Sequence, residues 1–139
     1  MPLILPKVTI AAAVSLVAGP ISFIEPGPNR DLILQANFLY GAGGTSVDAW
    51  VQSTLDGGTT WYDIANFHFT TAAAVKLANL SSGTPVTTLV TPGSGALSAN
   101  SVLDGLIGDQ LRVLYTSVGT YTGATALSVF ASGTRLRAN

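Results

Sequence analysis

The sequence contains no cysteine and very few charged residues. The absence of cysteine excludes a disulfide-stabilised scaffold, a thiolate metal site and a cysteine nucleophile. Charged residues make up 9% of the 139 residues, whereas an ordinary soluble domain has about 25%. Six Lys and Arg against seven Asp and Glu give a net charge of −1, so the basic stripe of a nucleic-acid-binding protein is missing. An apolar share of 47% excludes an acidic disordered tail.

No apolar run reaches the length of about 20 residues that a membrane-spanning helix needs. The longest run, Val8–Ala18, resembles the apolar core of a signal peptide, with Ala18 and Gly19 near a cleavage point. The run also alternates as a β-strand does, because every second residue from Val8 to Leu16 is apolar and falls on one face. We favour the strand and expect no association with a membrane.

An apolar arm, residues 1–7, comes before this segment. It holds Leu3, Ile4 and Leu5 between Pro2 and Pro6. Chain ends fray unless something ties them down, so we expect the arm to dock on its own domain or on a neighbouring molecule. Its three central residues are therefore candidate interface residues. Residues 8–139, which follow the arm, have the right length for a single domain.

Alternation of apolar and polar residues recurs along the rest of the chain and predicts strands over residues 32–40, 47–52, 61–70, 111–116 and 124–132. Turn signals separate them, among them Gly41-Ala42-Gly43-Gly44 and Asp56-Gly57-Gly58. Short strands joined by hairpin turns predict an all-β fold, a single antiparallel β-sandwich or jelly-roll-like domain that carries the N-terminal apolar arm.

Two segments have no clear period. Thr71–Leu80 fits a short helix by its alanine and leucine content and fits a further strand equally well. Ser81–Ser101 is rich in Ser, Thr, Gly and Pro and predicts a long loop, within which Val86–Val90 has the composition of a strand. Long loops in compact domains are often binding elements.

The most specific short motif is an Asp box, Ser/Thr-x-Asp-x-Gly-x-Thr-Trp. Its residues are Thr54, Asp56, Gly57, Gly58, Thr60 and Trp61. The aspartate can accept backbone N–H groups across a turn, and the glycines allow a positive φ. In the sialidase-type propellers and other β proteins that carry this motif, it staples a hairpin. The single copy and the scattered arginines argue against a glycosidase, so we expect a structural hairpin.

Other polar residues offer little to an enzyme. Asp104 and Asp109 could share a calcium ion or cap turns, and we favour turn capping because the spacing lacks the alternating ligands of an EF-hand. His68 is the only histidine and has no acid or serine beside it in the sequence, which favours a surface or interface position. We expect no enzymatic activity, no catalytic residue, no bound cofactor and no metal site.

Two aromatic residues complete the candidate interface. Trp50 lies on an otherwise polar strand face between Asp48 and Gln52. Its ring could stack on a sugar, pack under a loop or pack against another subunit, and we favour packing. Tyr62 is the second residue that could form a stacking platform. A carbohydrate-binding β-sandwich module of the adhesin type is therefore an alternative function.

Several stretches resemble small virion proteins of tailed bacteriophages over residues 30 to 130. They are Leu34–Phe38, Gly43–Gln52, Leu55–Phe67, Asp104–Val113 and Gly119–Gly123. The resemblance implies a structural role, either a capsid decoration (cement) protein that stabilises the head by bridging capsomers, or a head–tail or tail-fibre component. It implies a virion location after assembly in the host cytoplasm, with the major capsid protein or other virion proteins as partners. The sparse charge also favours a homo-oligomer, because weakly polar surfaces associate readily.

Overall fold

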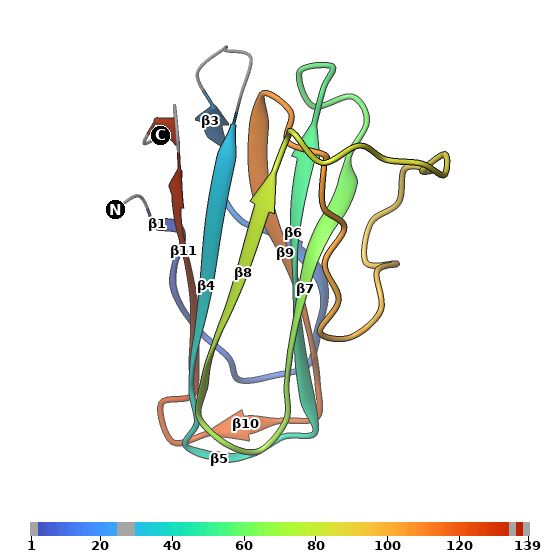
Figure 1. Cartoon of the computed structure of the whole chain (residues 1–139). Helices are drawn as coiled ribbons and strands as arrows, with labels where there is room; N and C mark the ends of the chain where they lie inside the picture. The colour runs from blue at the N-terminus through green and yellow to red at the C-terminus, as the bar shows by residue number, and fades with distance from the viewer. Residues whose placement is uncertain (1–2, 25–29, 134–135, 138–139) are drawn as a thin grey trace.

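A computed structural model describes residues 3–24, 30–133 and 136–137, which form two antiparallel sheets packed face to face (Figure 1). Sheet A has the order β1 (Leu3–Thr9), β11 (Ala126–Gly133), β4 (Asp31–Leu39) and β8 (Ala74–Ser81). Sheet B has the order β12 (Leu136–Arg137), β3 (Ser22–Ile24), β9 (Gln110–Val118), β6 (Ser46–Thr54) and β7 (Tyr62–Phe69), and β2 (Val14–Ala18) also pairs with β9. The described residues include no helix. The predicted all-β sandwich is confirmed.

Alternation along the strands places the core between the sheets. In β4, Leu32, Leu34, Ala36 and Phe38 are buried, whereas Ile33 and Leu39 on the opposite face are exposed. The rings of Phe38 in sheet A and Phe69 in sheet B stack with centroids 4.9 Å apart. Each large side chain buried in this way contributes about 1.5–3 kcal/mol, so the two layers are held together mainly by apolar contact.

Two very short strands close one end of the sandwich. β5 (Ala42–Gly43) and β10 (Tyr121–Thr122) pair with each other below the two sheets (Figure 1). The Tyr121 side chain is buried there and donates a hydrogen bond from its hydroxyl to the Thr70 carbonyl at 2.8 Å. Burial raises the pKa of Tyr121, and the neighbouring Tyr40 adds to this effect.

The prediction of one strand over Val8–Ala18 is wrong. β1 ends at Thr9 and pairs with β11 in sheet A, whereas β2 begins at Val14 and pairs with β9 in sheet B. The chain crosses between the sheets at residues 10–13, where Ile10 donates its N–H to the Thr125 carbonyl at 2.9 Å. Ala12 and Leu16, two of the apolar residues expected on one face, are exposed, and the period of the sequence alone does not reveal the change of sheet.

The apolar arm is a strand of its own domain. Leu3–Thr9 lies along β11, and Ile4 and Leu5 are buried in the core. Ile4 and Leu5 are therefore core residues and not interface residues, because their side chains fill the space between the sheets. Leu3 points outward and stays exposed. Met1 and Pro2 lie outside the described residues.

Most of the ambiguous segment Thr71–Leu80 belongs to strand β8 (Ala74–Ser81), at the edge of sheet A. The following residues form the long loop (residues 82–109), which leads to β9 without a regular strand. A strand at Val86–Val90 is therefore not formed in this structure, and its main chain has no partner strand among the described residues.

Candidate functional site

The long loop folds back over the outer face of sheet B and lies beside β7 (Figure 1). Backbone bonds hold it to the edge of that strand: Asn66 donates its N–H to the Ser101 carbonyl, and Leu103 donates to the Ile64 carbonyl, both at 2.9 Å. These bonds cover an edge that could otherwise pair with another chain.

A buried polar network anchors the loop to the sheet face. Asp63 of β7 is nearly buried, and its carboxylate accepts backbone N–H groups from Gly95 at 3.2 Å, Ala96 at 2.7 Å and Leu97 at 3.1 Å. Gln52 of β6 donates to the same carboxylate at 2.9 Å, and Arg112 of β9 donates to the Gln52 side-chain oxygen at 2.7 Å. Neighbouring strands thus contribute one residue each to a row that ends at the loop.

Both tryptophans are packed beside this network. Trp50 is only 8% exposed, and its indole N–H donates to the Leu97 carbonyl at 3.0 Å. Packing under a loop, one of the alternatives for Trp50, is therefore confirmed, and its assignment to an exposed interface or a sugar platform is wrong. Trp61 is also buried, with the Arg112 guanidinium 4.2 Å from the centroid of its ring. Burial lowers the pKa of Arg112, and the nearby Asp63 charge opposes that shift.

The Asp box forms the hairpin that joins β6 to β7. The Asp56 carboxylate accepts a hydrogen bond from the Thr60 N–H at 2.8 Å and another from the Thr54 hydroxyl at 2.9 Å. The indole N–H of Trp61 donates to the Gly58 carbonyl at 2.9 Å. The bond from the Thr60 backbone holds the pKa of Asp56 below its usual value. The motif is a structural staple here, as predicted.

His68 faces a carboxylate that the sequence places 20 residues away. Asp48 on β6 lies opposite His68 on β7, with Oδ1 at 2.8 Å from Nδ1 of the ring. Asn66 donates its side-chain amide to the same oxygen at 3.3 Å. The described residues show no hydroxyl bonded to this ring, so the pair lacks the nucleophile of a hydrolytic triad. Its visible role is to tie β6 to β7.

The two acids considered for calcium have separate surroundings. Asp104 accepts the Ser81 N–H at 2.7 Å, the Gly105 N–H at 2.8 Å and the Thr84 hydroxyl at 3.0 Å. The Ser81 bond holds the pKa of Asp104 below its usual value. Asp109 donates its N–H to the Thr54 carbonyl at 2.8 Å. Asp104 caps the turns at both ends of the loop, and no group of three or more acidic or histidine side chains placed for a metal occurs in the described residues.

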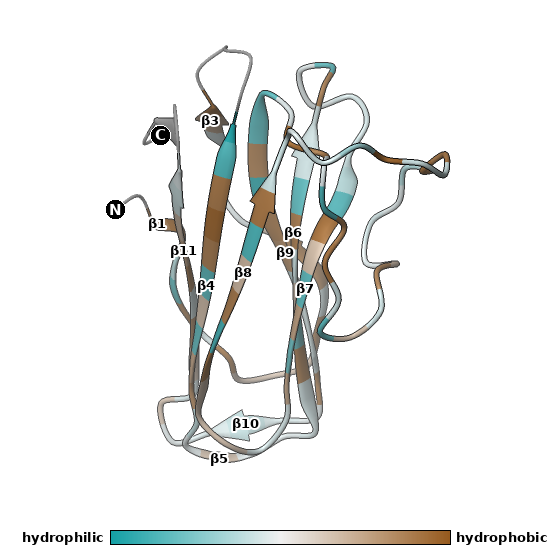
Figure 2. Cartoon of the chain, in the orientation of Figure 1, coloured by the Kyte–Doolittle hydropathy of each residue, from teal (hydrophilic) through white to brown (hydrophobic). Residues whose placement is uncertain are grey.

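The outer face of sheet A carries almost no charge. In the four strands of sheet A two charged residues are exposed, Lys7 in β1 and Asp31 at the start of β4. Large apolar residues on this face are 42–64% exposed: Leu3, Ile33, Leu39, Val75 and Leu77. In Figure 2 apolar residues (brown) and polar residues (teal) follow one another along β4 and β8. We call this surface the sheet A face.

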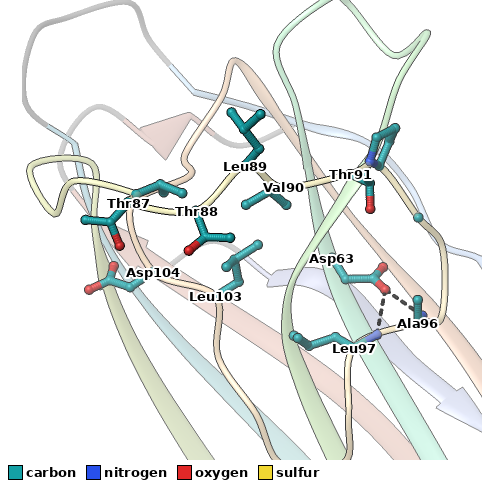
Figure 3. Close-up of a pocket in the computed structure, with 13 residues that line it drawn as sticks. Asp63, Thr87, Thr88, Leu89, Val90, Thr91, Ala96, Leu97, Leu103 and Asp104 are labelled. Atoms are coloured by element: carbon teal, nitrogen blue, oxygen red, sulfur yellow. Dashed lines mark hydrogen bonds between the residues drawn. The ribbon is translucent and has the colours of Figure 1, made fainter.

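A second apolar feature lies in the long loop. Residues 85–92, which we call the arch, stand away from the sheet and leave a hollow of about 590 Å³ (Figure 3). Asp63 and Asp104 lie at opposite ends of this hollow, and Leu89 points away from it, 98% exposed. Tyr62 is half-buried and lines a neighbouring hollow together with Leu55 and Leu106. Of the candidate interface residues, Leu3, Tyr62 and His68 thus reach the surface, although on different parts of it.

The Asp63–Gln52–Arg112 row was missed in the sequence, because its residues come from separate strands and the loop they hold is not periodic. One signal was present: Asp63 interrupts the apolar face that Trp61, Ala65 and Phe67 form in the predicted strand, and a carboxylate in such a place needs donors such as backbone N–H groups.

No helix of the described residues is long and apolar enough to cross a membrane. The chain matches no protein-family model, no curated protein and no solved structure.

Proposed function

We propose that this chain is a structural protein of a tailed-phage virion, a capsid decoration protein that binds the head through the sheet A face and bridges neighbouring capsomers. The observation that carries the proposal is the sheet A face itself, which exposes five large apolar residues, while the exposed charges of its strands are Lys7 and Asp31. Large apolar side chains exposed together on one sheet face are typical of protein contact sites.

The chemistry of that face suits a permanent contact with protein. Asn, Gln and Ser side chains alternate with the apolar ones, and Gln35 already donates a hydrogen bond to Asn37 at 2.9 Å. Burying such a surface requires little desolvation of charge, which is the main cost of covering ionic groups. Contacts that span two capsomers must be broken when the shell expands, so they stabilise it mechanically.

The rest of the molecule supports a non-catalytic role. Trp50 and Trp61 are both buried, so neither ring offers a face to a sugar. Asp56, Asp63 and Asp104 each accept several hydrogen bonds that hold turns or loops. The polar groups that an enzyme or a lectin would need at its surface are used here to fix the fold.

Substitution of Leu77 tests the proposal directly. Leu77→Lys places a charge on the sheet A face, in its edge strand β8, at a side chain that is 64% exposed. Leu55→Lys is the matched control, because Leu55 is 61% exposed but lies on the Asp-box hairpin. Co-sedimentation with phage heads that lack this protein measures binding.

Loss of one buried leucine contact costs about 1.5–3 kcal/mol, so Leu77→Lys should weaken head binding at least about tenfold. Leu55→Lys should bind as the unaltered protein does. Equal binding of the two variants, or binding of the unaltered protein to purified tails and not to heads, contradicts the decoration role.

A further inference from the structure

The arch has the composition of a β-strand but no strand partner in the part of the chain that the structure describes. Val86-Thr87-Thr88-Leu89-Val90 is made of β-branched and apolar residues, which favour strands. Among the described residues, none forms a hydrogen bond with the main chain of residues 85–92. The arch therefore presents a row of free N–H and C=O groups, as an edge strand does.

Exposed side chains accompany this free main chain. Leu89 is 98% exposed, and Val86 is also exposed. The hollow behind the arch leaves room on the side that faces Leu97 and Leu103 (Figure 3). An unpaired main chain with an exposed leucine is the arrangement that strand addition uses, in which backbone bonds provide affinity and alternate side chains provide fit.

We propose that the arch pairs with the arch of a second copy of this chain, as two antiparallel strands related by a two-fold axis. The five residues are nearly palindromic, so the axis through Thr88 sets Val86 opposite Val90 of the second copy and Thr88 opposite its own equivalent. Thr87 then lies opposite Leu89 of the second copy. Residues 82–92 contain no charged residue, so like charges never meet across the axis.

Two features bear on the extent of the pairing. Pro85 and Pro92 bracket the segment and cannot donate a ladder hydrogen bond, so the pairing ends at both sides. The chain bends at Thr88, and pairing straightens this bend without breaking any hydrogen bond of the arch. A contact about a two-fold axis uses the same edge of both arches, so each copy satisfies the edge that the other presents.

The dimer does not rest on the capsid role, because it uses the arch and leaves the sheet A face open. An extended segment of another protein is the competing occupant of the arch, and the experiment below separates the two.

Cysteine cross-linking of the full chain tests the pairing, since the natural sequence has no cysteine. Residues directly opposite in an antiparallel pair have Cα atoms about 4.5–5.5 Å apart, within reach of a disulfide. Thr88→Cys should therefore give a covalent dimer under mild oxidation. Thr91→Cys is the matched control, because residue 91 also lies in the exposed arch. In this register the Cα atoms of residue 91 in the two copies are about 20 Å apart.

A charge at the arch provides the second readout. Leu89→Lys should weaken the dimer at least about tenfold in sedimentation velocity, whereas Leu77→Lys on the sheet A face should leave it intact. The proposal is overturned if the unaltered protein stays monomeric at high concentration, if Thr88→Cys stays monomeric under oxidation, or if Thr91→Cys cross-links equally well. A failure of Leu77→Lys to affect head binding would concern the capsid role alone.

Discussion

Replacement of Asp63 by asparagine should release the long loop from sheet B. The Asp63 carboxylate accepts four hydrogen bonds, two at each oxygen: Gln52 and Gly95 donate to Oδ1, and Ala96 and Leu97 donate to Oδ2. An asparagine side chain keeps one oxygen and replaces the other by an NH₂ group. Whichever way the amide is turned, two of the four donor groups then point at the NH₂ group, which is itself a donor and cannot accept a hydrogen bond from them.

The magnitude follows from this count. A hydrogen bond to a charged group contributes about 1.5–3 kcal/mol, and a buried donor left without an acceptor costs about 1–3 kcal/mol. The loop segment is partly exposed, so water can relieve part of the loss. We expect Asp63→Asn to lower the free energy of unfolding by about 2–4 kcal/mol, a large share of the 5–15 kcal/mol typical of a domain.

Tryptophan fluorescence can report both local release of the loop and a loss of global stability. Trp50 bonds to Leu97 of the loop, so local release of the loop should increase quenching by acrylamide, and global destabilisation should lower the urea midpoint. Asp31→Asn is the matched control, because Asp31 is exposed at the start of β4.

The free energy of unfolding of the control variant should stay within about 0.5 kcal/mol of that of the unaltered protein. An Asp63→Asn variant with the same urea midpoint and the same quenching as the unaltered protein would refute the anchoring role.

Two further predictions concern turns. Gly44 and Gly57 share a φ of +72°, but a Cβ on Gly44 would lie 2.2 Å from the Tyr121 ring, whereas a Cβ on Gly57 would meet nothing within 4 Å. Gly57→Ala should cost about 1–2 kcal/mol for the left-handed backbone alone, and Gly44→Ala about 3 kcal/mol or more because the buried ring must move; equal losses in urea denaturation would contradict this. Because its folded pKa lies below 3.8, Asp104 stabilises the fold above that pH, and this contribution is lost as the pH falls through the folded pKa. Asp104→Asn should therefore show a shallower loss of stability below pH 3.8, and an acid limb as steep as in the unaltered protein would count against this role.

Strand positions were predictable because a pleated strand sends successive side chains to opposite faces. In the strand predicted over residues 32–40, the structure buries Leu34 and exposes its neighbour Ile33. The same rule failed at Val8–Ala18, where the chain leaves sheet A after Thr9 and enters sheet B at Val14. Sheet membership depends on hydrogen-bond partners far away in the sequence, such as Ser117 for Val14.

The pairing of His68 with Asp48 shows a subtler limit. Near the hairpin turn Gln52 pairs with Asp63, and counting outward from this pair sets His68 opposite Val47. A bulge between Val51 and Gln52 shifts the register by one residue and brings His68 opposite Asp48. A bulge leaves no composition signal in this stretch, so this side-chain pair could not be found from spacing.

The sheet A face is the centre of the functional account, and its orientation on the particle tests that account most directly. Electron cryomicroscopy of the virion should show this two-sheet domain on the outer surface of the head, with β4 and β8 against the capsid protein across a capsomer boundary. Density for the domain only in the neck or tail, or on the head with the sheet A face turned to solvent, would contradict it.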